Sequence, residues 1–182
     1  MSDIYYSKYL KYKNKYLDLK KLQSGGASST NPLAVMSRDI RQFINISDEN
    51  HEKYISEFFP EEIFPTQEIF AQKYNQLLEI EISTDPLANV RNLFIASSLI
   101  MLALESNVTL SKLTQDLAEK EDLKNINTLV IVSDQQDFQS SISEVANLHG
   151  LATVDEGSLF CMFPDVITAY RFAIKNRTDL NT

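Results

Sequence analysis

Two adjacent glycines, Gly25 and Gly26, have the residue type and spacing for a defined reaction, the hydrolysis of a peptide bond. A protease with a narrow tunnel over its catalytic centre accepts only residues without side chains beside the scissile bond. The surrounding segment 24–32 consists of small polar residues and favours an exposed, flexible linker, which is where chains are usually cut. The pair therefore predicts a processing site, with a plain hinge as the alternative.

Other side chains give no catalytic pattern. Cys161 is the sole cysteine, which excludes an intrachain disulfide and a cysteine-bound zinc site. Its neighbours Phe160 and Met162 favour a buried, inert thiol over a nucleophile. His51 and His149 have no partners at metal-ligand spacing, and there is no Ser-His-Asp order, phosphate-binding loop or dinucleotide turn. We therefore expect no enzyme, no catalytic residue and no resident metal or cofactor.

Residues 1–26 differ in composition from the rest of the chain. They hold five of the eight tyrosines and six lysines against two aspartates, a charge of about +4. The whole chain carries −8, so residues 27–182 carry about −12. The tyrosines recur at spacings of three and four, which predicts an amphipathic helix over residues 4–22. Lysines beside an aromatic stripe also suit a membrane-surface helix or a nucleic-acid contact, and both alternatives stay open.

The segment 5–26, YYSKYLKYKNKYLDLKKLQSGG, resembles the N-terminal block of many otherwise unrelated proteins of giant DNA viruses of the Mimivirus group. This resemblance implies a viral origin, synthesis in the host cytoplasm or viral factory, and a place in the virion. Such viruses use a SUMO-protease-like core protease that cuts after Gly-Gly, which would divide Gly26 from Ala27 and makes this protease and other virion proteins the expected partners. Bacterial double-glycine export leaders are a competing family. They are acidic and have an aliphatic residue where this chain has Gln23, so the basic leader of this chain does not match them.

The acidic body and its one long apolar run restrict the partners further. A charge of about −12 argues against general nucleic-acid binding, which requires cations that displace phosphate counterions. The run over residues 93–104 has 12 residues, fewer than the roughly 18–20 that cross a bilayer. We therefore expect a buried helix there and no transmembrane segment.

Helices are expected through most of the first two thirds of the chain, because capping residues stand before amphipathic or apolar runs. Thr66, Asp85 and Thr109 are each placed to accept hydrogen bonds from the first turn of a helix. The predicted helices cover residues 33–46, 47–59, 66–82, 86–105 and 109–120.

Strands are expected only near the C-terminus. Short β-branched and apolar runs predict strands over residues 128–133, 151–154 and 158–163. Helices are predicted over residues 135–149 and 164–175. Gly150 is expected to be the C′ residue of the first of these helices. Gly157 is expected to take a positive φ in the turn between the last two strands. The order βαββα corresponds to half of a ferredoxin-like sheet with helices on one face.

Residues 128–174 also resemble part of class III nucleotide cyclase domains. The motif TLVIVSDQQDF places Asp134 after the first strand, and the hairpin places Glu156 in its turn. By this resemblance the two carboxylates hold Mg²⁺ and a nucleotide triphosphate. Asp137 replaces a glycine of the family, and the chain stops at Thr182, before further family strands. These departures imply a non-catalytic relative, and a helix cap and a turn are the alternative roles of the two residues.

The sequence thus predicts an α+β protein with four parts: a leader (1–26), a linker (27–32), a helical region (33–126) and a βαββα module (127–182). The favoured function is a non-enzymatic structural or accessory virion protein whose leader is cleaved. A degenerate, cyclase-like nucleotide-binding module and a host-interaction protein are the alternatives.

Overall fold

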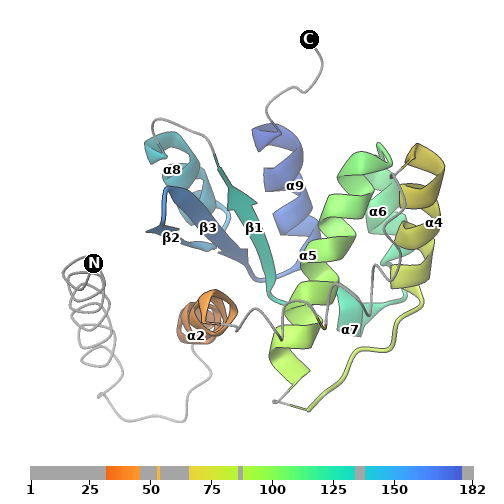
Figure 1. Ribbon diagram of the computed structural model, residues 1–182, viewed down its shortest axis with the longest axis horizontal. Helices are drawn as coiled ribbons and strands as arrows, with labels where there is room; N and C mark the ends of the chain where they lie inside the picture. The colour runs from red at the N-terminus through yellow and green to blue at the C-terminus, as the bar shows by residue number, and fades with distance from the viewer. Residues whose placement is uncertain (1–31, 46–52, 54–65, 86–87, 134–137, 178–182) are drawn as a thin grey trace.

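The computed structural model describes residues 32–45, 53, 66–85, 88–133 and 138–177 (Figure 1). Within them, seven helices and a three-stranded antiparallel sheet confirm the predicted α+β class. The leader, the glycine pair and the predicted helix 47–59 lie outside the described residues. The helices are α2 (Pro32–Ile44), α4 (Gln67–Leu78), α5 (Asn89–Glu105), α6 (Leu110–Asp116), α7 (Glu121–Lys124), α8 (Gln139–Asn147) and α9 (Val166–Asn176). The strands are β1 (Thr128–Val132), β2 (Leu151–Asp155) and β3 (Ser158–Phe163).

Three helices begin at side-chain caps. The Thr66 hydroxyl accepts from the backbone N–H of Ile69 at 3.4 Å, and the Thr109 hydroxyl accepts from Lys112 N–H at 3.1 Å. Asp165 accepts from both the N–H and the hydroxyl of Thr168, each at 2.7 Å. These bonds satisfy donors that a first helical turn leaves without partners. The caps predicted at Thr66 and Thr109 are confirmed.

Several helix boundaries differ from the predictions. Helix α4 ends at Leu78, because the following residues alternate between exposed Glu79 and Glu81 and half-buried Ile80 and Ile82. Alternation with period two suits an extended segment that packs its isoleucines on the core. Helix α5 begins at Asn89, and the backbone carbonyl of Asp85 instead accepts from the N–H of Ala88 at 2.9 Å. Helix α6 ends at Asp116 and the short α7 follows, whereas one helix through residue 120 was predicted.

The sheet has the order β1-β3-β2, with both neighbouring pairs antiparallel. Cys161 at its centre lies opposite Val130 on one side and Ala152 on the other. The hairpin between β2 and β3 turns on Glu156 (φ 47°) and Gly157 (φ 81°). Positive φ at both central residues is what a type I′ turn requires, and it confirms the conformation predicted for Gly157.

The two faces of the sheet pack against different helices. Val132 and Phe163 belong to a large core that α5, α8 and α9 complete. On the opposite face, Leu129 and Met162 pack against Met36 of α2. The prediction of helices on one face holds for α8 and α9 but is wrong for the whole sheet, because α2 covers part of the other face (Figure 1).

The helical region and the βαββα module share one hydrophobic core. Helix α5 lies at its centre, with Ile95, Leu99 and Leu102 fully buried, as predicted for this apolar run. The same cluster contains Phe163 and Phe172, whose rings are 4.9 Å apart. In the part of the chain that the structure describes, no helix is long and apolar enough to span a bilayer.

Candidate functional sites

The end of β1 and the β2–β3 turn meet at one edge of the sheet. Ser133, directly after β1, has its hydroxyl oxygen 3.1 Å from that of Ser158, the first residue of β3. Glu156 is exposed in the turn two residues before Ser158, whereas Asp134 lies outside the described residues. The structure therefore brings the Glu156 turn next to the residue that precedes Asp134.

The side chains at this edge of the sheet are polar. The Ser133 and Ser158 hydroxyls can donate and accept hydrogen bonds, and the exposed Glu156 carboxylate can accept them. Among the described residues, no group of three or more His, Cys, Asp or Glu side chains is arranged to hold a metal ion. Any Mg²⁺ here would depend on Asp134 and on ligand oxygens in addition to Glu156.

Cys161 and His149 both lie within the described residues. Cys161 is fully buried in β3, and burial raises the pKa of its thiol to about 12. His149 is exposed after α8 and has a φ of 58°. His51 lies outside the described residues. Cys161 is therefore placed as a core side chain and not as a nucleophile.

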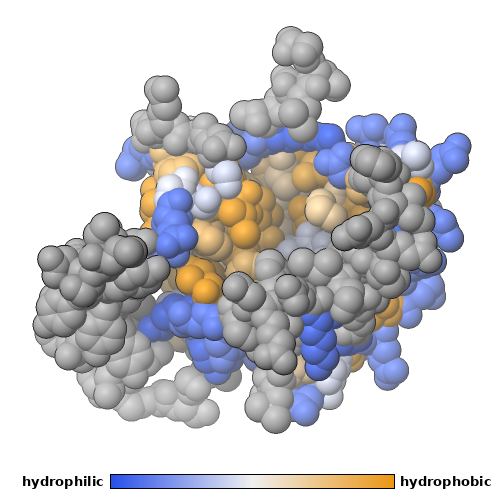
Figure 2. Space-filling model, viewed as in Figure 1, coloured by the Kyte–Doolittle hydropathy of each residue, from blue (hydrophilic) through white to orange (hydrophobic). Residues whose placement is uncertain are grey.

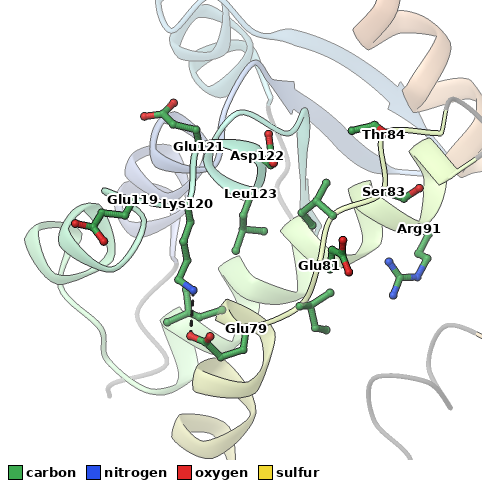
Figure 3. A pocket seen from close by; sticks show the side chains of 13 residues that line it. Glu79, Glu81, Ser83, Thr84, Arg91, Glu119, Lys120, Glu121, Asp122 and Leu123 are labelled. Carbon is green, nitrogen blue, oxygen red and sulfur yellow. Dashed lines mark hydrogen bonds and ion pairs between the residues drawn. The ribbon is translucent and has the colours of Figure 1, made fainter.

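An open acidic cleft of about 1020 Å³ lies beside the segment that joins α4 to α5, across from α7 (Figure 3). The Lys120 ammonium approaches the Glu79 carboxylate at 3.0 Å across the cleft. Hydrogen bonds from Lys124 and Asn125 lower the pKa of Glu121. Carboxylates outnumber cations among the lining residues by five to two. The carboxylates belong to Glu79, Glu81, Glu119, Glu121 and Asp122, and the cations to Arg91 and Lys120.

This cleft can attract a cation or a basic segment of a protein, because its lining carries more negative than positive side chains and because it is open to solvent. The sequence did not single it out, since its carboxylates come from two segments about 40 residues apart. Alternating glutamates and isoleucines over residues 79–82 were the available signal, and they were assigned to a helix instead.

Tyr74 connects α4 to α6 beneath the surface. Its hydroxyl donates to Asp116 at 2.8 Å, and Lys112 bonds the same carboxylate. Burial, followed by the bond to Asp116, raises the pKa of Tyr74 above its ordinary value. The phenol therefore stays protonated and acts as a structural donor.

Comparisons with known protein families, with curated proteins and with solved structures found no match for this chain. The fold places this chain in the α+β class. Its function is inferred from the leader and from the surfaces described above.

Proposed function

We propose that this protein is a non-enzymatic structural or accessory component of a giant-virus particle, released from its leader by cleavage after Gly26. The leader carries the proposal, because segment 5–26 has both the tyrosine and lysine spacing of the Mimivirus-group block and its terminal glycine pair. The charge contrast between about +4 in the leader and about −12 in the body supports a separable unit. Cleavage would remove six lysines and leave an acidic protein.

Two surfaces of the body support a role in assembly. The acidic cleft suits a basic protein partner. On the sheet face that α2 partly covers, Ile131 is 45% exposed and Phe160 is half-buried. Figure 2 shows apolar side chains gathered over this part of the molecule. Exposed apolar surface with a polar surround is typical of protein contacts, and viral or host proteins are both suitable partners.

Analysis of the N-terminus and intact mass of the protein tests this function. Protein from purified particles should begin at Ala27, whereas protein from lysates early in infection should retain the leader. Substituting Gly26→Val should block the cut, because a branched side chain cannot enter a glycine-selective tunnel, while Ser24→Ala serves as the control. Protein with an intact leader in mature particles would contradict the cleavage, and absence from purified particles would contradict the virion role.

A second candidate function is nucleotide binding at the edge formed by β1 and the hairpin. It is supported by the 3.1 Å approach of the Ser133 and Ser158 hydroxyls beside the Glu156 turn. Calorimetry with Mg²⁺ and ATP or GTP should then show binding that Asp134→Ala weakens, as a lost metal ligand would. Absence of heat with both nucleotides would rule this function out.

A further inference from the structure

A small polar pocket of about 200 Å³ lies where α2, α5 and the segment after α7 meet. It is separate from the acidic cleft and the sheet edge. Its volume far exceeds the roughly 30 Å³ that one water molecule occupies in the liquid, so it can admit a small organic group. Asp39 comes from α2, Asn92 from α5, and Asn125 and Asn127 from the segment after α7.

Two oxygens of this pocket are buried without a hydrogen bond. Asp39 and Asn92 are each only 7% exposed, and Oδ1 of both residues has no hydrogen-bond partner. Arg38 Nε forms an ion pair with Asp39 Oδ1 at 3.7 Å, which is beyond hydrogen-bond distance, and the Arg38 side chain is 54% exposed. A buried acceptor without a donor is costly, so these oxygens indicate that the pocket receives a donor.

The amide nitrogens around the pocket are directed at other acceptors. Asn127 Nδ2 donates to Asp39 Oδ2 at 2.9 Å, and Asn92 Nδ2 donates to the Ser83 carbonyl at 2.7 Å. Asn125 Nδ2 donates to Glu121 at 2.9 Å. Since each amide is oriented by its nitrogen, its oxygen remains as an acceptor. The pocket therefore offers several oxygens and one negative charge to a group that only donates.

Apart from Asn89, the remaining lining residues are apolar, and they distinguish between possible donors. Val35, Leu93 and Ile126 line the pocket beside the oxygens. A divalent metal ion favours more than one carboxylate and keeps bound water molecules, to which apolar side chains cannot form hydrogen bonds. A primary ammonium has three N–H donors, one positive charge and an alkyl chain, and so matches the oxygens, the single carboxylate and the walls.

We propose that this pocket binds a primary alkylammonium group, carried either by a small free amine or by a lysine side chain. Asp39 Oδ1 and Asn92 Oδ1 accept its N–H groups, while Val35, Leu93 and Ile126 contact its carbon chain. Asn125 is exposed, which provides a route from solvent.

The test is an NMR titration of the full chain with n-butylammonium chloride, following the side-chain amide signals of Asn92 and Asn127. Tetramethylammonium has the same charge but no N–H donor, and it serves as the ligand control. We expect saturable shifts with n-butylammonium and none with tetramethylammonium. Equal responses to both cations, or no saturable response, would overturn the proposal, as would displacement by CaCl₂ at equal concentration.

Substitution identifies the acceptor. Asp39→Asn should weaken n-butylammonium binding by about tenfold or more, since a charge-assisted bond is lost. Asp122→Asn removes the same charge from the open cleft and should leave the affinity unchanged. Val35→Phe should fill the pocket and abolish binding with no change of charge. Unchanged affinity in folded Asp39→Asn protein would contradict the assignment, and circular dichroism reports whether each variant is folded.

The source of the group is tested with a second ligand. Nα-acetyl-lysine-N-methylamide presents the same ammonium on a peptide unit. Saturable binding of this compound at the Asn92 signal supports a lysine side chain, while binding of n-butylammonium alone supports a small free amine. Binding of neither compound would refute the proposed site.

Discussion

Gly150 and Gly157 are required for different physical reasons. Gly157 has a φ of 81° and open space where a Cβ would lie, so its requirement is backbone conformation. Gly150 was predicted as the first residue beyond the end of α8, but His149 takes that place and has the left-handed conformation, with a φ of 58°. A Cβ on Gly150 would lie 2.8 Å from the Met162 carbonyl oxygen and 2.8 Å from Val145 Cγ1. Gly150 is therefore required for close packing between α8 and β3.

Substitution separates these two requirements. Gly150→Ala and Gly150→Asn should each destabilise the protein by about 1–3 kcal/mol, because the added atoms collide with backbone. Gly157→Ala should cost about 1 kcal/mol, and Gly157→Asn should cost less, since asparagine tolerates positive φ. Urea unfolding followed by circular dichroism measures all four. A Gly150→Asn variant as stable as Gly157→Asn would contradict the packing explanation.

Burial controls the reactivity of Cys161. With a thiol pKa of about 12, roughly one molecule in 10⁴ carries the thiolate at pH 8, where the thiolate is the reactive form. We expect negligible reaction with a disulfide reagent in the native protein and one thiol per chain after urea unfolding. Raising the pH from 8 to 9 should accelerate the native reaction about tenfold while the fold persists. Rapid labelling of native protein at pH 8 would show that the thiol is accessible.

At the scale of elements, helix starts were easier to predict than helix ends. A start depends on one side chain and an N–H two or three residues later, so Thr66 and Thr109 could be recognised locally. The ends of α4 and α6 depend on packing, because Ile80, Ile82 and Leu117 contact the shared core. Asp85 was predicted as a cap, which is wrong, because its backbone carbonyl closes a turn ahead of α5.

The three observed caps should differ in strength. Asp165→Ala removes two bonds of 2.7 Å and should cost about 2 kcal/mol, whereas Thr109→Ala removes one of 3.1 Å and should cost about 1 kcal/mol. Thr66→Ala removes one exposed bond of 3.4 Å and should cost less than either. Asp165→Asn retains an acceptor and is the control. Free energies of unfolding from urea titrations provide the ranking, and a reversed order would contradict it.

At the scale of the molecule, helix α5 joins the helical region to the sheet. Leu99 is fully buried in the core that both parts share, and Met101, two residues later, is 42% exposed. The helical region and the βαββα module, which their predicted elements divide at residue 127, therefore pack around the same side chains. We expect them to unfold together, since neither retains its core alone.

Two truncations on α5 test this cooperativity. Leu99→Ala should destabilise the protein by about 3 kcal/mol and accelerate hydrogen exchange of the β1 and β3 amides as well as of the helices. Met101→Ala should cost less than about 1 kcal/mol, because its side chain is already partly in water. Faster exchange confined to the helices in Leu99→Ala would show that the module folds independently.

The sequence by itself determined the α+β class, the three strands, the buried character of α5 and the caps at Thr66 and Thr109, since each depends on nearby residues. It also supplied the leader on which the proposed virion role depends. Only the tertiary structure decided that α2 covers the second sheet face, that one core spans both regions, and that Asp39 and Asn92 share a pocket. These features join residues far apart in the chain, and local periodicity carries no information about which buried faces meet.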